Sequence, residues 1–183
     1  MSTEPEGPEG SARKQELLRA SLDYAATHSL SDLSLRPLAK AIGSSPRVLL
    51  YLFGSKTGLI SDVLALNRAE QQELLRQARE RDAGARESLQ LLWGWIVDPA
   101  RDNLRRLFLE AYIRSAGSTD EAWHDFARRS VDDWLDSLAV LIGQSSTLAL
   151  AVIRGLVLDL LATNDLRRVN AAWKHFLDTH YPV

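Results

Sequence analysis

Residues 34–60 constrain the fold of this chain more than any other stretch, because they hold two short helical patterns separated only by Gly-Ser-Ser. The first pattern places Leu35, Leu38, Ala39 and Ile42 at i, i+3, i+4 and i+7, so that one face of a short helix is apolar. The glycine that follows suits the left-handed conformation that ends many helices. One helix is therefore expected to stop there and a second to begin at once.

The second pattern has the signals of a helix start, since Ser45 is a favourable N-cap and Pro46 suits the first helical position. Leu49 and Phe53 lie four residues apart and are expected to pack inward. Two short helices joined by a tight turn form a helix-turn-helix, whose second helix usually enters the major groove of DNA. The sequence therefore predicts that residues 46–53 read DNA, and we include Ser45 and Pro46 in the predicted DNA-binding set.

The outward face of this second helix is expected to consist of Arg47, Val48, Tyr51 and Leu52. An apolar side chain can contact a thymine methyl group but cannot hydrogen-bond to a base edge. Either the DNA target is rich in A·T steps and is read mostly by its shape, or Arg47 supplies most of the polar specificity. The alternative that Val48 and Leu52 belong to the core remains open.

Two basic residues are expected to contact phosphates. Arg36 falls in the first turn of the first short helix, which Ser34 can cap, and Lys56 falls in the first turn of the helix capped by Ser55 after Gly54. Free backbone N–H groups at a helix start favour an anion. The alternative for Arg36 is an ordinary solvated surface charge.

Residues 16–64 resemble the N-terminal domain of the TetR family of bacterial transcriptional regulators. The resemblance is carried by the spacing of Leu38-Ala39, Gly43, Leu49, Tyr51, Phe53, Ser55-Lys56 and Leu59. It implies a DNA-binding head, a helical body with a regulatory pocket, and a homodimer formed by the last two long helices. The chain departs from the family at positions 48, 50 and 52, where relatives often carry Thr, Tyr and His that touch DNA and this chain has Val, Leu and Leu.

The charge distribution agrees with a DNA-binding head. The whole chain has a net charge of -2, but residues 11–60 carry seven basic and three acidic residues, a net charge of +4. A basic module on an acidic body is typical of a protein that binds phosphates. The chain contains no cysteine, which excludes disulfides and thiol catalysis. Residues 1–11 are expected to form a disordered tail that is not a signal peptide, and the protein is expected to be cytoplasmic.

The rest of the chain reads as a series of helices. Together with the two short ones, helices are expected at residues 12–27, 56–81, 88–97, 99–115, about 119–142 from a Thr119 or Asp120 cap, 147–163 and from 165 onward. The helix at 147–163 is apolar around most of its circumference and shorter than the roughly 20 residues of a bilayer span. It is therefore expected to be buried on one side in its own subunit and on the other in a second copy. The predicted contacts with that copy are Leu156, Leu160, Trp173 and Phe176.

Aromatic residues are concentrated between positions 88 and 141, in the part that the resemblance assigns to a regulatory pocket. Large rings often only fill a core. As a set, however, they can line an apolar cavity with one or two polar anchors, for which Glu110 and Arg114 are candidates. A small hydrophobic or aromatic effector is therefore expected to contact Trp93, Phe108, Tyr112 and Trp134.

No catalytic or metal-binding constellation is expected. Asp132, Asp133 and Asp136 are similar to the aspartate-rich motif of terpene synthases, but the second metal motif is missing and three solvated carboxylates on a helix are the simpler interpretation. His124, His175 and His180 do not form a helical i, i+4 pair. No cofactor is expected.

The sequence thus predicts an all-α protein with a helix-turn-helix domain at residues 12–56 and a regulatory and dimerisation domain at residues 57–183. The expected function is a transcriptional regulator that binds a double-stranded DNA operator as a homodimer, most simply a repressor released by the effector, without a role for a membrane. The alternative is a ligand-binding or interaction protein of the same fold with weak or lost DNA binding. An enzyme is the third class.

Overall fold

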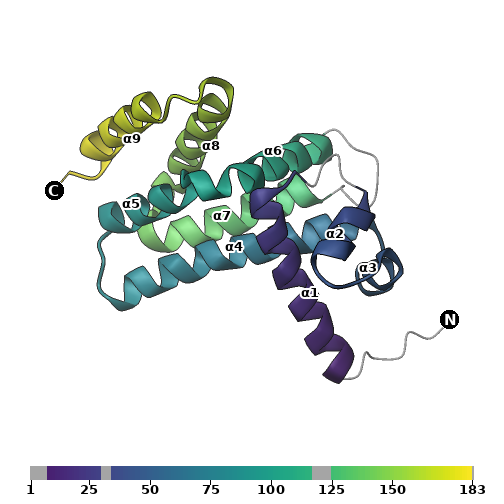
Figure 1. The fold of residues 1–183 in the computed structure, drawn as a ribbon. Coiled ribbons are helices and arrows are strands. Elements are labelled where there is room, and N and C mark those ends of the chain that lie inside the picture. Colours follow the sequence, from purple (N-terminus) through teal and green to yellow (C-terminus); the bar gives the residue numbers. More distant parts are fainter. Residues whose placement is uncertain (1–7, 30–33, 117–124, 183) are drawn as a thin grey trace. The chain divides into compact units, whose positions relative to one another are not determined.

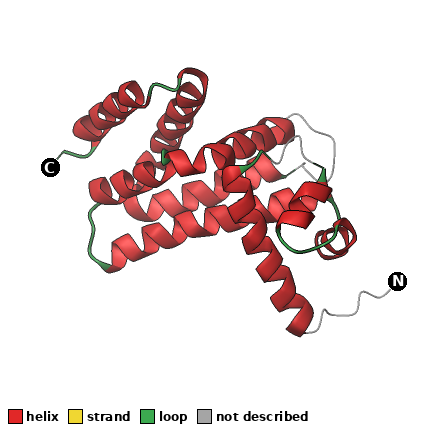
Figure 2. Cartoon of the chain, viewed as in Figure 1, coloured by secondary structure: helices red, strands yellow, loops and turns green. Residues whose placement is uncertain are grey.

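A computed structural model of the chain describes residues 8–29, 34–116 and 125–182, and every regular element in these ranges is a helix (Figure 1; Figure 2). The α-helices are α1 (Pro8–Thr27), α2 (Leu35–Ala41), α3 (Pro46–Phe53), α4 (Lys56–Glu80), α5 (Ala85–Ile96), α6 (Asp102–Ala116), α7 (Phe126–Ile142), α8 (Ser146–Thr163) and α9 (Leu166–His180). Two single 3₁₀ turns, η1 (Pro99–Arg101) and η2 (Gly143–Ser145), precede α6 and α8. The all-α prediction is confirmed.

The predicted helix boundaries differ from the structure mainly at the N-terminal ends. Helix α1 begins at Pro8, so that residues 8–11 are helical where a tail was predicted. A proline is well suited to the first helical position because it has no N–H that needs a partner. The predicted cap at Thr119 or Asp120 and the rest of the tail, residues 1–7, lie outside the described residues.

The chain divides into two compact units, residues 1–68 and 69–183, and α4 continues from the first into the second. This boundary lies inside α4, twelve residues after the predicted one at residue 56. The first unit contains α1, α2, α3 and the start of α4 around a small apolar core. The side chains that are at most 3% exposed in this core are Leu17, Leu22, Ala25, Leu38, Ala39, Leu49, Leu59, Val63 and Leu64.

The junction of α3 and α4 is too tight to admit a side chain at position 58. A Cβ atom placed on Gly58 would collide with the carbonyl oxygen of Phe53, the last residue of α3, and would lie 3.4 Å from Oγ of Ser55. The Gly58 N–H donates to that same Oγ at 2.9 Å, which caps α4 as predicted. Position 58 therefore holds α4 close against the end of α3.

The second unit is built around α7, which packs against α5, α6 and α8, while α8 packs against α9. Figure 1 shows α8 and α9 as a helical hairpin, with the C-terminus at the end of α9. One core joins these helices. Its most deeply buried members are Leu89, Leu92, Leu138, Ala149, Val169 and Leu177.

Helices α7 and α8 together form a run, Phe126–Thr163, that is long and apolar enough to cross a membrane by length and composition alone. One such run is weak evidence, because a core helix of a soluble protein passes the same test. The run is broken by η2, where Gly143 has a φ of 56°. Trp134 and Leu138 of α7 and Ile153 of α8 lie in the core of the second unit, so packing inside the protein accounts for their apolar character.

Replacing Gly58 by Ala is expected to destabilise the first unit by about 1 to 3 kcal/mol, because the methyl group has to displace the backbone at the end of α3. The measurement is thermal unfolding followed by circular dichroism. Gly94 is the matched control, since it also lies in a helix but its Cβ would meet open space. Gly94→Ala is expected to raise stability by about 1 kcal/mol through helix propensity alone. Equal melting temperatures for Gly58→Ala and wild type would contradict the tight junction.

Candidate functional site

The turn between α2 and α3 is held by backbone hydrogen bonds that only a glycine accommodates easily. The N–H of Ser44 donates to the carbonyl of Ala39 at 2.8 Å, and that of Gly43 donates to the carbonyl of Lys40 at 3.5 Å. This is the Schellman pattern, and Gly43 takes the left-handed conformation it requires, with a φ of 65°. Residues 35–53 therefore form the helix-turn-helix that the sequence predicted.

The N-caps of α2 and α3 differ in strength. Oγ of Ser45 accepts a hydrogen bond from the N–H of Val48 at 3.2 Å, and Pro46 occupies the first position of α3, as predicted. Ser34 also takes the extended backbone conformation of an N-cap, but its side chain accepts no capping hydrogen bond. Arg13 of α1 supports the turn by donating from Nη2 to the Gly43 carbonyl at 3.3 Å.

Helix α3 buries three of its eight residues. Leu49 is 1% exposed, Phe53 is 7% and Leu52 is 9%. The predicted outward position of Leu52 is therefore wrong. Leu52 and Phe53 lie three and four residues after Leu49, which places all three on one helical face. The open alternative is correct for Leu52 but not for Val48.

The opposite face of α3 is exposed and largely apolar. Tyr51 is 79% exposed, Leu50 is 44% and Val48 is 39%, with the exposed Arg47 beside them. Leu50 was not among the predicted outward residues, although its position directly after the inward-facing Leu49 could have indicated it. Three large side chains with much of their surface in solvent form an exposed, largely apolar patch, so this face is a candidate contact surface.

The basic residues of the first unit fall into two groups. Some are occupied within the unit, such as Lys14, whose Nζ lies 3.6 Å from the Asp62 carboxylate and 5.4 Å from the centre of the Phe53 ring. Arg36, Lys40 and Arg47 instead are exposed and form no ion pair with any described residue. These three cations, on α2 and α3, are therefore available to an anionic partner. Lys56 is half-buried in the first turn of α4, next to the Ser55 cap.

Three of the four predicted dimer contacts are buried within a single chain. Leu160, Trp173 and Phe176 are 5%, 3% and 7% exposed within a single chain, where Trp173 stacks on Phe176 at 5.3 Å between ring centres. They belong to the core between α8 and α9, so the prediction that they face a second copy is wrong. Leu156 is half-buried and packs against the same core.

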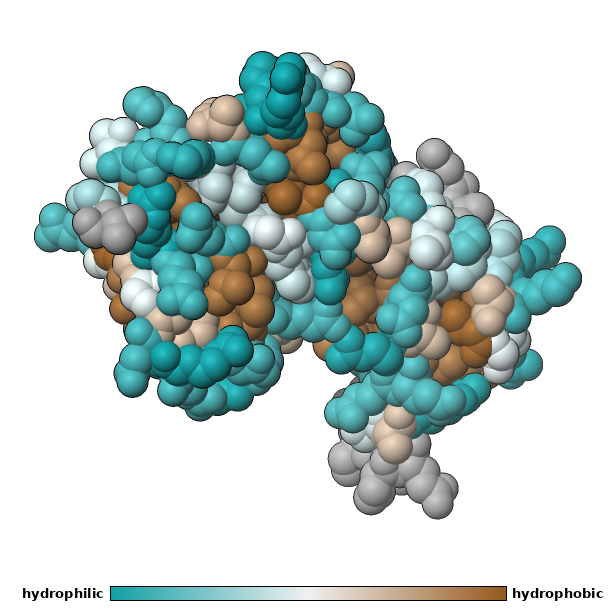
Figure 3. Space-filling model, turned by 60° about the vertical axis from the view of Figure 1, so that its left-hand side comes forward, coloured by the Kyte–Doolittle hydropathy of each residue, from teal (hydrophilic) through white to brown (hydrophobic). Residues whose placement is uncertain are grey.

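A different face of α8 remains uncovered. It consists of residues at alternating spacings of three and four, all of them small or apolar: Leu148, Ala151, Gly155, Leu158 and Ala162. Leu148 is 46% exposed and Leu158 is 49% exposed. Figure 3 shows that apolar patches reach the molecular surface between hydrophilic residues on the face it draws. We call these five residues the α8 stripe.

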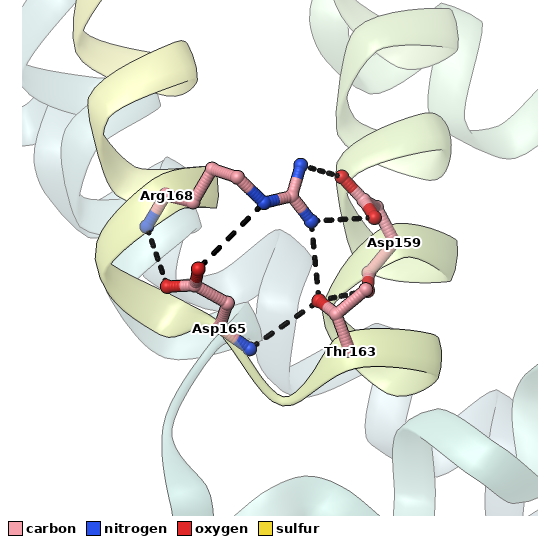
Figure 4. A network of polar contacts seen from close by, with 4 residues as sticks. All are labelled: Asp159, Thr163, Asp165 and Arg168. Atoms are coloured by element: carbon pink, nitrogen blue, oxygen red, sulfur yellow. Dashed lines mark hydrogen bonds and ion pairs between the residues drawn. The ribbon is translucent and has the colours of Figure 1, made fainter.

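The connection from α8 to α9 is fixed by a polar network (Figure 4). The guanidinium of Arg168 on α9 donates to both carboxylate oxygens of Asp159 on α8, at 2.6 and 2.7 Å, and to Oγ1 of Thr163 at 3.1 Å. The Asp165 side chain caps α9 by accepting from the Arg168 N–H at 3.0 Å. The hydrogen bonds from Arg168 lower the pKa of Asp159 below its ordinary value. The network therefore holds the hairpin that presents the α8 stripe.

The aromatic residues predicted to line a pocket are divided between two clusters. Trp93 stacks on Trp173 at 5.0 Å and donates from Nε1 to Oδ1 of Asn170 at 2.8 Å. Trp134 is 8% exposed and lies in the core of the second unit. That Trp93, Phe108, Tyr112 and Trp134 line a pocket stays a prediction.

The second cluster belongs to α6 and the start of α7. Phe108 lies 5.9 Å from Tyr112 and 6.1 Å from Phe126 between ring centres, and Phe108 and Tyr112 are half-buried. The predicted polar anchors Glu110 and Arg114 are both exposed residues of α6. A basic residue of α8, Arg154, donates to the Tyr112 hydroxyl of this cluster.

The acidic residues of α7 have ordinary surface partners. Oδ2 of Asp132 lies 3.3 Å from Nη1 of Arg128, one turn away, which is the arrangement expected for a solvated helical face. Asp136 is exposed and Asp133 half-buried. No group of three or more His, Asp or Glu residues that could hold a metal ion occurs in the part of the chain that the structure describes.

The fold is shared with proteins of known structure. A protein from Rhodococcus sp. named as a TetR-family transcriptional regulator matches with a TM-score of 0.72 and 20% identity, over 93% of this chain and 98% of that one. A protein from Pseudomonas aeruginosa PAO1 named as a transcriptional regulator matches with a TM-score of 0.62 and 20% identity, over 95% of this chain and 91% of that one. Neither a protein-family model nor a curated protein matches the sequence. The fold implied by the sequence resemblance is confirmed over nearly the whole chain.

Proposed function

We propose that this protein is a DNA-binding transcriptional regulator of the TetR type, most simply a cytoplasmic repressor that a small molecule releases from its operator. The proposal depends on the two faces of helix α3. One face is buried and anchors the helix in the core, and the other exposes Arg47, Val48, Leu50 and Tyr51. A short anchored helix of this kind, following a tight turn, suits insertion into the major groove. The shared fold supports the same assignment.

The composition of the exposed face determines how the DNA is read. Tyr51 has a hydroxyl group and Arg47 a guanidinium that can reach base edges, whereas Val48 and Leu50 can contact only thymine methyl groups or sugars. Arg36 and Lys40 on α2, with Lys56 on α4, can contact phosphates. Base-specific hydrogen bonds then come from two residues, and the remaining specificity comes from methyl contacts and DNA shape.

The second candidate function is an interaction protein of the same fold without tight DNA binding. It is favoured by one observation, the apolar pair Val48 and Leu50 on the exposed face of α3. The two functions differ in their response to salt, because phosphate contacts release counterions and an apolar protein contact does not. A gel-shift assay with DNA from the promoters flanking the gene distinguishes them.

A homodimer is part of the proposal, with the α8 stripe as its contact surface. Two copies of α8 can approach closely along the stripe because three of its five residues are Gly or Ala, and Leu148 and Leu158 can then fill the space between them. The contact would be isologous, with the same residues on both subunits. The operator is then expected to have two half-sites related by two-fold symmetry.

Binding to promoter DNA is expected to weaken steeply with salt, with a slope set by the number of phosphate contacts. Lys56→Ala should weaken binding to all sequences and reduce the slope by about one, whereas Arg47→Ala should alter which sequences are preferred. The measurement is fluorescence anisotropy of labelled duplexes at several salt concentrations. Arg129→Ala, an exposed arginine on α7, is the control and should bind as wild type does. Identical curves for all three variants would sink the assignment of the DNA-binding surface.

Leu158→Glu is expected to give a folded monomer, because it places a charge within the α8 stripe but outside the core of the single chain. Leu160→Glu should instead unfold the second unit, since a buried leucine is lost at a cost of about 3 kcal/mol or more. Ile113→Glu, at a 66% exposed position on α6, is the control and should remain dimeric. Sedimentation velocity and circular dichroism report mass and folding. A Leu158→Glu protein that sediments as a dimer would exclude the stripe as the contact.

A further inference from the structure

We propose that Arg154 and Tyr112 form the head-group site for an anionic effector, a carboxylic acid with an apolar body, in the second unit. The proposal deepens the proposed function, on which it rests, by naming the chemical class of the small molecule. It also replaces the predicted anchors Glu110 and Arg114 with a residue from α8. The site is carried by the contacts and burial of these two side chains and of the rings beside them.

Arg154 reaches from α8 to α6 and lies against an aromatic ring. Its Nη1 donates to the Tyr112 hydroxyl at 3.2 Å, and the guanidinium carbon lies 4.7 Å from the centre of the Tyr112 ring. The hydroxyl accepts this hydrogen bond, so its own hydrogen remains to be donated, and no described residue accepts it. Two neighbouring side chains thus each retain a donor without a described acceptor.

No carboxylate of a described residue lies within ion-pair distance of Arg154. Its Nη2 is shielded from solvent and has no hydrogen-bond partner among the described residues. Burial lowers the pKa of Arg154 below its ordinary value, with the Tyr112 contact opposing the shift. A shielded cation without a counter-ion reduces stability, which an anionic ligand would reverse.

The other partly buried arginines of the second unit each have a carboxylate. Nη2 of Arg86 lies 2.6 Å from Oδ1 of Asp178, Nη1 of Arg101 lies 3.5 Å from Oε2 of Glu70, and Nη2 of Arg105 lies 3.1 Å from Oδ1 of Asp102. Arg105 also donates to the backbone carbonyls of Ile96 and Asp98. Arg154 is therefore an exception to the pattern of its own unit.

The surroundings of Arg154 determine the rest of the ligand. The Tyr112 ring lies 5.9 Å from the ring of Phe108, which in turn lies 6.1 Å from the ring of Phe126, so that the three rings form one aromatic row of neighbours. A carboxylate that accepts from Nη2 of Arg154 and from the Tyr112 hydroxyl would place its hydrocarbon part along this row. Because Nη2 is covered, the half-buried side chains of Arg154 and Tyr112 have to rotate as the acid enters.

The test is a thermal-shift titration with benzoate, phenylacetate and decanoate, each paired with its uncharged amide. At about a hundred times its dissociation constant an acid should raise the melting temperature of the wild type by about 5 to 10 °C, and its amide should not. Arg154→Met should abolish the shift, and Arg154→Lys should restore part of it because a charge is present without the planar fork. Arg129→Met, which removes an exposed arginine from α7, should respond as wild type does.

Two results would overturn the proposal. One is that none of the three acids shifts the melting temperature at millimolar concentration, or that acids and amides shift it equally. The other is that Arg154→Met lowers the melting temperature without ligand by several degrees, because an arginine that is needed for folding is a structural residue. The proposal instead expects this variant to melt at or above the wild-type temperature.

Binding of promoter DNA distinguishes a failure of this proposal from a failure of the proposed function. Arg154→Met should bind DNA as tightly as wild type, and only the wild type should lose DNA affinity when acid is added. If the wild type binds no DNA but retains the acid-specific shift, the effector site stands and the regulatory role fails. If DNA binding is intact and no acid changes the stability or the DNA affinity, the regulatory role stands and the effector site fails.

Discussion

Helix α3 has only eight residues, and it has to bury enough of them to be held in the core while leaving others exposed. It is held in the first unit by one face, on which Leu49, Leu52 and Phe53 are buried. The close junction at Gly58 fixes its C-terminal end, and the Ser45 cap fixes its start. The opposite face remains exposed for contact, and it consists of the residues of α3 that the core does not bury.

A similar division of faces occurs on α8. The helix is apolar nearly all around, yet only one side packs on α7 and α9, and the α8 stripe on the other side is uncovered. The Asp159–Arg168 pair fixes the hairpin through groups at the surface, so it does not compete with the core for buried positions (Figure 4). At the edge between the two faces lies Arg154, which has no carboxylate partner among the described residues. A candidate contact surface and a candidate ligand site thus both lie on α8.

The fold was predictable from sequence because its signals are local. Gly43, Ser45, Pro46 and Ser55 mark helix ends by backbone conformation and capping, and each acts in the structure as predicted. The uncovered side of α8 was not predictable in the same way, because a helix that is apolar on two sides does not reveal which side faces its own chain. Leu160 was assigned to the wrong side for this reason. The contact of Arg154 with Tyr112, and the lack of a carboxylate near Arg154 among the described residues, depend on distances between residues far apart in the chain, which no local pattern contains.

The most direct test of the central claim is selection of binding sites from random double-stranded DNA by the purified protein. A dimer that reads DNA with α3 should enrich one sequence with two-fold symmetry, its half-sites separated by about one helical turn and rich in A·T pairs. Because Val48 and Leu50 are apolar, thymine is predicted at the base positions that these two side chains contact. Recovery of no enriched sequence at low salt would contradict the account, and the exposed face of α3 would then have to contact a protein.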